Sequence, residues 1–532
     1  MDGQDWTQTA IVSPMASRPS ARPTEVSPAA MPAAMPAGRS IRGRYDAAQT
    51  SANNSRHWAN ADGMSARAAN SPEVRRTLRN RTRYEIANNC YASGMVETLA
   101  DDMVGGGPIL QMQTGDTNLD RAIEYEWSQW DDAVGFADKL HTMRQTRAGD
   151  GEAFMFLETD PSLGDIQLDL ELYEADQIAT PTQFPFYQPF SVDGIVFDRH
   201  MKPRSYHRLK QHPGDMPARG AFLEYDEVPA RFVIHWFKRR RPGQYRGIPE
   251  LTPALGLFAM LRRYGLATLS SAEIGAAFSA VVYTDLPPQA GIQTVEPFEA
   301  FDYEHGMFTT MPAGWKMDQF QSQHPTANHE MFKRTTLEEI ARTLRIPYNV
   351  ASGNSAGYNY ASGRLDQQIY VKAVKVDRSR AEKEICNRVL MAWLQEAAMS
   401  TSLIAGGFER RGGWPHRWIW PGQEHVDPKK EADAQQTRLQ SLTTTFSEEC
   451  YKDGVDPDTR LQTIAREIEK CRELGIPSPY DKPTAGTATQ LPPPDPEDQQ
   501  DEGDGNGTGN GQASGNGRPD GYFPGRNGFH RP

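Results

Sequence analysis

A polar, glycine-rich link between two helical patterns constrains the fold of this 532-residue chain more than any other stretch. Before the link, apolar residues recur at helical spacing from Leu337 to Leu344, and Pro347 stops the pattern because proline cannot continue a helix. The link, residues 348–363, reads YNVASGNSAGYNYASG and contains no charged residue. A longer helical pattern follows over about residues 364–399. We therefore expect two helices around a loop whose length is usually functional or mobile; an ordinary surface loop is the alternative.

The composition describes a chain that can bury a core and is acidic overall. Apolar residues make up 38% and charged residues 24%, and 69 acidic against 57 basic side chains give a net charge of −12. This balance argues against a general nucleic-acid-coating protein. It does not exclude DNA in a local channel, because the field that acts on DNA there is local.

Cysteine usage and hydropathy indicate the compartment. The four cysteines are scattered without a CxxC pair, so we expect a reducing environment and neither a disulfide framework nor a zinc site. The N-terminus has no charged-then-apolar leader, and no run approaches the ~20 apolar residues of a spanning helix. We expect a soluble protein, made in the cytoplasm, without a membrane partner.

Two sequence motifs that carry enzyme chemistry are absent: there is no HExxH and no Walker A pattern. Asp150 and Glu152 flank a glycine, and without a partner histidine nearby we interpret them as part of a turn and not as an acid and base pair. His200, His207 and His212 lie in a proline-rich strand region, and their spacing does not favour a metal site. We expect no enzyme activity, no cofactor and no metal.

Helical patterns followed by strand patterns fill the first half of the chain. Helical spacing covers residues 72–104, in one or two pieces, and residues 119–146. Residues 150–173 alternate like strands, and shorter strand patterns continue to residue 236. Helices followed by a small sheet predict an α+β domain over about residues 72–240.

The second half of the chain alternates between helical and broken patterns. Residues 250–283 predict one long helix whose second half is rich in small residues, and residues 284–326 are an insertion interrupted by prolines and too short for its own core. Helices are expected again over residues 426–476. The compositions of residues 1–40 and 481–532 predict disorder.

Two basic clusters could contact phosphate groups. One lies at the start of the first helical pattern, over residues 75–83. Such a run of arginines more often forms a solvated face or a subunit contact than a phosphate site. The other is a basic loop, for which a solvated turn is the alternative and no base-specific contact is expected. The candidate basic contacts of this loop are Lys238, Arg239, Arg240, Arg241 and Arg246.

The run IARTLRIPYNVASGNSAGYNYASGR, residues 340–364, resembles the signature segment of the lambda-like family of tailed-phage portal proteins. Other segments resemble the same family in the same order: Tyr-Asp-Ala-Ala from Tyr45, Pro-Gly-Gln-x-Arg-Gly at residues 242–247, and Leu-Gly-Ile-Pro at residues 474–477. The chain departs from the family at residues 353–357, Gly-Asn-Ser-Ala-Gly, where a bulkier and often acidic residue is expected.

The resemblance spans about residues 43–476 and implies an α+β portal fold with an α/β wing, a long helical stem, a small clip insertion and a helical crown between disordered tails. The implied parts are a disordered N-terminal segment (1–40), the wing (41–240), the first stem helix (241–283), the clip (284–326), the second stem helix (327–346), the channel loop (347–363), the long wing helix with its following segment (364–420), the crown (421–480) and a disordered tail (481–532).

The resemblance also implies a function. Such a protein forms a homo-oligomeric ring, a dodecamer, at one capsid vertex of the virion. The ring conducts double-stranded DNA during packaging and ejection. It docks the terminase large subunit, capsid and scaffold proteins, and the head-tail connector proteins. A phage structural or adaptor protein of the head or tail that is not a portal is the alternative.

Particular residues follow from the same resemblance. The channel loop would bring Asn354, Ser355, Tyr358, Asn359 and Tyr360 nearest to the DNA, and a loop without Lys or Arg suits a duplex that must slide, since phosphate pairing would retain it. The clip interface would include Phe298 and Phe301.

Overall fold

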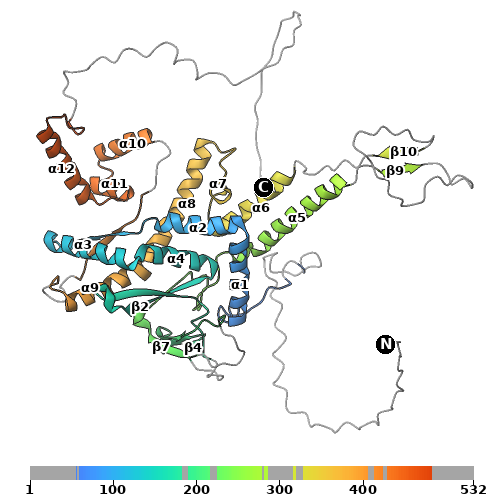
Figure 1. The fold of residues 1–532 in the computed structure, drawn as a ribbon, viewed down its shortest axis with the longest axis horizontal. Coiled ribbons are helices and arrows are strands. Elements are labelled where there is room, and N and C mark those ends of the chain that lie inside the picture. Colours follow the sequence, from blue (N-terminus) through green and yellow to red (C-terminus); the bar gives the residue numbers. More distant parts are fainter. Residues whose placement is uncertain are drawn as a thin grey trace, which may run out of the picture.

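The computed structural model describes residues 56, 59–181, 190–215, 224–277, 281–284, 315–318, 328–404, 413–422 and 428–481. The segments predicted to be disordered, apart from Asp481, and the clip residues Phe298 and Phe301 lie outside these residues. The described part combines helices with small antiparallel sheets, which confirms the α+β prediction (Figure 1). No helix in this described part has both the length and the apolar character that a bilayer crossing requires.

The first two predicted helical regions each fold as two helices, α1 (Pro72–Asn88) with α2 (Cys90–Val104) and α3 (Thr117–Val134) with α4 (Phe136–Gly149). Asn89 leaves the helical conformation after α1, and its side chain accepts a hydrogen bond from the Tyr91 amide, which caps α2. Gly135 adopts φ +67°, a left-handed conformation that suits glycine, and so separates α3 from α4.

Two antiparallel sheets follow these helices. In the first, β2 (Glu152–Thr159) lies between β3 (Leu168–Tyr173) and β8 (Val233–Phe237). In the second, β4 (Ser191–Val192), β5 (Ile195–Phe197), β6 (Pro203–Leu209) and β7 (Tyr225–Pro229) pair in chain order. Phe154 and Phe156 of β2 pack with Ile195 and Tyr206 in a core between the two sheets.

Helix α5 (Leu255–Ala277) projects from the body, and β9 (Val281–Thr284) lies beyond its outer end (Figure 1). The prediction of one helix from residue 250 to 283 is therefore too long at both ends. Residues 281–284 are Val-Val-Tyr-Thr, which favour a strand, and β9 pairs with β10 (Trp315–Asp318). Helix α6 (Asn328–Leu344) then returns the chain to the body.

The link predicted over residues 348–363 is shorter than expected. A short helix, α7 (Tyr348–Ser352), occupies its beginning, and α8 (Tyr360–Ala381) starts four residues before the predicted position. A π-helical turn (Glu382–Cys386) joins α8 to α9 (Asn387–Ser400), so the predicted long helix exists with one irregular turn. Strand β11 (His416–Ile419) then pairs with β1 (Ile109–Met112).

Two further hydrophobic cores fix these helices. Trp127, Trp130 and Trp393 pack together where α3 meets α9. The other core joins α2, the start of α5, α6, α7 and α8 around the base of the link; it includes Met95, Leu99, Leu251, Phe258, Leu337, Ile340, Leu344, Tyr370 and Val374. Each large apolar side chain buried in this way contributes about 1.5–3 kcal/mol relative to exposure.

The turn at Gly151 packs closely against the end of the basic loop. A Cβ on Gly247 would lie 2.1 Å from the Gly151 carbonyl oxygen, so only glycine fits there. Beside this contact, Arg246 Nη2 lies 2.7 Å from Glu152 Oε1, and both side chains are buried. Burial would raise the pKa of Glu152, but Arg246 and His235 outweigh it and hold that pKa well below its usual value. The other acid of the predicted turn, Asp150, pairs with Arg83 of α1 at 2.6 Å, so both acids hold parts of the fold together.

The last described helices, α10 (Pro428–Gln440), α11 (Phe446–Lys452) and α12 (Pro457–Leu474), attach to the body through polar contacts. The Gln111 side chain donates to Asp456 Oδ1 at 2.6 Å and accepts from the Tyr451 hydroxyl at 2.9 Å. Nearby, Glu124 of α3 accepts the Met112 amide at 2.7 Å. Burial, with a smaller contribution from the charge of Asp456, raises the pKa of Glu124 to about 7, although the bond from the Met112 amide acts in the opposite direction.

Replacing Arg246 should destabilise the fold, because removing one partner of a buried ion pair leaves the other charge unpaired. We expect Arg246→Ala to lower the free energy of unfolding by about 3–5 kcal/mol, measured by urea denaturation followed by tryptophan fluorescence. The matched control is Arg241→Ala in the same loop, where the side chain is exposed and the change should stay within about 0.5 kcal/mol. Equal effects of the two variants would contradict this account.

Replacing Glu124 should change the pH dependence of stability. Its pKa is raised from 4.5 to about 7 in the folded chain, so its stabilising contribution is complete below pH 4.5 and is lost as pH rises toward and past 7. We expect Glu124→Gln, which keeps an acceptor for the Met112 amide, to melt at a higher temperature than the parent at pH 8 and at a similar temperature at pH 4.5. Glu126→Gln, exposed on the same helix, is the control. A pH-independent difference for Glu124→Gln would disprove the assignment.

Candidate functional site

The link between α6 and α8 presents a small polar tip on a fixed base. Gly353 ends α7 with φ +63°, and the Asn354 side chain accepts the Ala356 amide at 2.8 Å. Residues 353–357 are all exposed. The part of the link that is free to meet another molecule is therefore this five-residue tip, which carries no charge.

The predicted loop residues divide into different roles. Asn354 and Ser355 lie in the exposed tip, whereas Asn359 caps α8 by accepting the Ser362 amide at 2.8 Å. Tyr358 is half-buried, and burial raises the pKa of its hydroxyl with a further contribution from Asp366. Tyr360 is the first residue of α8. Two of the five thus belong to the free tip.

Charged side chains flank the tip without belonging to it. On α6, Arg334 pairs with Glu338 at 3.0 Å and lies over the ring of Tyr348 at 5.1 Å. Arg345, between α6 and α7, adopts φ +65°, an uncommon conformation for a residue with a side chain, and its guanidinium pairs with Asp377 of α8 at 3.3 Å. Both sides of the link are therefore tied to the body.

A buried ion network lies beneath the link and was missed by the sequence analysis. Arg147 of α4 donates to Glu250 Oε1 at 3.0 Å, just before α5, and to Asp377 Oδ2 at 2.8 Å on α8. Arg144 adds a 3.5 Å contact to Glu250. Burial would raise the pKa of Glu250, but the two arginines outweigh it and bring it to about 2. The residues are far apart in sequence, so no local pattern could have paired them.

The basic loop does not act as one patch. Arg246 is 1% exposed and donates to Glu152, so the prediction that it is a surface contact for phosphate is corrected: its guanidinium is used inside the protein. Lys238 is half-buried, and burial lowers its pKa. Arg239, Arg240 and Arg241 remain exposed.

The cluster at the start of the first helix divides in the same manner. Arg75 and Arg79 are buried and pair with Asp193 and Asp176. Arg76 and Arg81 are exposed. Because one side of a helix packs on the body and the other faces water, the position of each arginine around the helix decides whether it is buried or exposed.

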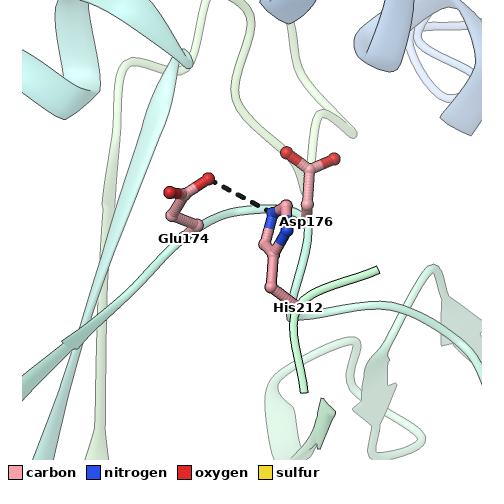
Figure 2. Close-up of side chains that lie close together, drawn as sticks. All are labelled: Glu174, Asp176 and His212. Carbon is pink, nitrogen blue, oxygen red and sulfur yellow. Dashed lines mark ion pairs between the residues drawn. The ribbon is translucent and has the colours of Figure 1, made fainter. Parts of the chain in front are cut away.

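Glu174, Asp176 and His212 form the one group within the described ranges that has the spacing of a metal site (Figure 2). Their surroundings argue against a cation. Arg83 pairs with Asp176 at 3.1 Å and with Glu174 at 2.9 Å, and Arg79 also pairs with Asp176, so arginine side chains already occupy both carboxylates of the group. The Gly214 amide donates to His212 Nδ1, which leaves the proton of the neutral ring on Nε2, the atom facing Glu174 at 3.3 Å. His200 and His207 are not part of this group.

A groove of about 1410 Å³ extends from the link along α8. Ser355, Tyr358 and Asn359 line its beginning. The groove continues between α8, β11, α10 and α11, and its lining contains both cations and carboxylates. The groove reaches the tip directly, because Ser355 of the tip is part of its lining.

Comparison with protein families matches residues 52–375 to the model described as "Phage portal protein, lambda family". The chain is 26% identical over 437 residues to a "Probable portal protein" of Halomonas phage phiHAP-1, covering 76% of this chain and 82% of that protein. It is 20% identical to "Portal protein B" of Escherichia phage lambda and 21% identical to the "Portal protein" of Escherichia phage N15. The chain matches 56% of the length of each of these last two proteins.

Among solved structures, the chain is similar to proteins in the "Neck of native GTA particle computed with C12 symmetry" and the "Neck of empty GTA particle computed with C6 symmetry". The TM-scores are 0.39 and 0.41 at 12% and 13% identity, covering 73% and 74% of this chain and 95% and 98% of those chains. These likenesses are too distant for a detailed comparison.

The family match covers more than half of the chain and includes the link, both basic clusters, the helix before the link and most of α8 after it. It confirms the resemblance seen in the sequence and favours a portal over a head or tail adaptor. The family is structural, which agrees with the expectation that the chain is not an enzyme. The chain therefore belongs to the lambda family of phage portal proteins.

Proposed function

We propose that the chain assembles as a ring at one vertex of the capsid and that the exposed tip of the link lines the channel through which double-stranded DNA passes. The observation that carries this proposal is the tip at residues 353–357, which is uncharged and exposed while its base is held by the buried network of Arg147, Glu250 and Asp377. A rigidly held loop with a small, uncharged tip suits a surface past which a charged polymer must slide.

Ring formation needs a surface that another copy can cover. Helix α5 exposes Met260, Leu266 and Leu269, each more than half exposed, together with the small residues Ala267 and Ser270. Exposed apolar side chains of this size are unfavourable in water, and a neighbouring copy would bury them. A heterologous contact that repeats with a fixed rotation closes into a ring, and the ring creates the channel.

The neutral tip supports low-friction contact with DNA. Each Lys or Arg that neutralises a phosphate displaces counterions and so strengthens DNA binding. A moving duplex would have to break each such contact before it could advance. The three exposed arginines of the basic loop, Arg239, Arg240 and Arg241, are the remaining candidates for phosphate contact.

The proposed parts follow the family pattern. The sheets and helices α1–α4 would form the wing, α5 and α6 the stem, and α10–α12 the crown. The insertion between β9 and β10, with Phe298 and Phe301, would form the clip that docks the terminase large subunit and later the head-tail connector proteins. Capsid and scaffold proteins would surround the ring, a dodecamer made in the host cytoplasm and carried in the virion.

Placing positive charge on the tip should slow DNA movement. We expect Asn354→Lys with Ser355→Lys to leave folding and ring assembly intact, because both positions are exposed, and to slow DNA packaging several-fold at low salt with recovery as salt increases. The measurement is packaged DNA per unit time in a reconstituted reaction at several salt concentrations. The neutral control is Asn354→Gln with Ser355→Thr. Packaging by the lysine variant at the parental rate at every salt concentration would refute the channel position of the tip.

The ring itself is tested by native mass. A dodecamer would have a mass of about 700 kDa (12 × 59.4) and a central hole in negative-stain images. We expect Leu266→Glu with Leu269→Glu to give smaller species, because a neighbour would have to bury two charges. Leu442→Glu, exposed between α10 and α11, should not. Rings formed equally well by the α5 variant would show that another surface closes the ring.

A further inference from the structure

The groove along α8 has a wall with unpaired positive charge. Arg364, Lys372 and Lys375 line it and are exposed, and their spacing of eight and three residues places them on one face of the helix. Within the described ranges, none of the three has a carboxylate partner. The row is about 17 Å long at the rise of an α-helix.

Of the four carboxylates that line the groove, three pair with other cations and one accepts a neutral N–H donor, and in the described part of the chain none pairs with this row. Glu449 accepts from Arg438 and Lys452, and Glu431 also accepts from Arg438. Asp453 pairs with Arg460 at 3.1 Å, and Glu382 accepts the Trp420 indole N–H at 2.6 Å. The groove therefore offers three free cations above a lining that includes Trp418 and Pro421. An extended, strongly acidic segment with some apolar character fits this surface.

We propose that residues 491–504 of this chain, LPPPDPEDQQDEGD, occupy the groove. Six of these residues are acidic and none is basic, in a chain whose whole net charge is −12. Successive prolines favour an extended polyproline II conformation, so less conformational entropy is lost when the segment binds. The acidic ten residues from Asp495 to Asp504 would span about 31 Å in that conformation, enough to follow the whole row.

The path of the chain after α12 supports this occupant. Gly475 ends α12 with φ +66°, and the chain turns back so that the Tyr480 hydroxyl donates to Glu467 at 2.6 Å. Tyr480 and Arg460 line one small cavity of about 390 Å³, and the partner of Arg460, Asp453, lines the groove. The Arg460–Asp453 pair therefore connects the cavity beside Tyr480, next to the last described residue, with the lining of the groove.

The tether between Asp481 and Asp495 has the necessary reach. Its 14 Cα-to-Cα steps can extend to about 46 Å, well beyond the length of the row. A tethered segment also has an effective concentration on the order of millimolar, which a separate molecule must exceed to displace it. The attraction is electrostatic and partly exposed, so salt should weaken it.

In this arrangement the acidic segment shields the cations next to the link from other polyanions, including DNA. The inference requires only the folded chain and does not depend on the proposed channel. Two other occupants can be distinguished from it: a second copy of the folded part of the chain, and duplex DNA.

Zero-length carbodiimide crosslinking of the full chain tests the proposal, because the reagent joins a lysine to a carboxylate only where the two are in contact. We expect peptide mass spectrometry to find Lys372 or Lys375 linked to an acidic residue between Asp495 and Asp504 at low salt, with at least a fivefold lower yield at high salt. Links from these lysines only to carboxylates of the folded part that lie outside the groove would overturn the proposal in favour of a second copy, and links only to the carboxylates that line the groove would show that the acidic segment is not there. The absence of any link would also overturn it.

Charge-neutral variants provide a second measurement that does not need a lysine. Replacing the six acids of residues 491–504 by Asn or Gln should increase amide hydrogen exchange of α8 and α10 in the full chain several-fold. The double variant Lys372→Gln and Lys375→Gln should do the same. Arg76→Gln with Arg81→Gln, which removes two exposed cations from α1, is the matched control and should leave this exchange unchanged. Groove protection that changes only on adding duplex DNA, and not with these variants, would reject the acidic segment as the occupant.

Discussion

The ion pairs that Arg147 forms with Glu250 and Asp377 hold together the parts of this protein that carry its function. One guanidinium joins α4, the entry to α5 and the last turns of α8. Charges buried this deeply are costly to desolvate, and removing one partner is more costly still, so the three elements keep one arrangement. The adjacent apolar core, with Leu251, Ile340 and Tyr370, surrounds the same junction.

The properties of the link follow from this junction. Arg345 and Asp377 tie its approach to α8, and the Asn359 cap fixes where α8 begins. The remaining tip is short, exposed and uncharged. A loop that was mobile along its whole predicted length could not present its small side chains at a defined place, whereas a five-residue tip between two fixed ends can.

Much of the fold could be predicted because helix and strand patterns are local. The proline after α6, the alternation in β3 and the apolar face of α9 were sufficient to place those elements. The break at Asn89, the end of α5 at Ala277 and the start of α8 at Tyr360 were placed less well, because capping and strand pairing compete with helical propensity at those points. Of the five candidate loop residues, only Asn354 and Ser355 lie in the exposed tip.

The sequence by itself determined the order of the elements, the α+β class and the family resemblance, because each depends on the spacing of apolar residues and on short motifs along the chain. The tertiary structure decided which charges are available to a partner. Arg246 and Arg241 stand in one basic loop, yet the first is enclosed with Glu152 and the second faces solvent. Burial and pairing depend on segments far apart in the sequence, 94 residues for Arg246 and Glu152 and 230 for Arg147 and Asp377, and only the folded chain brings them together.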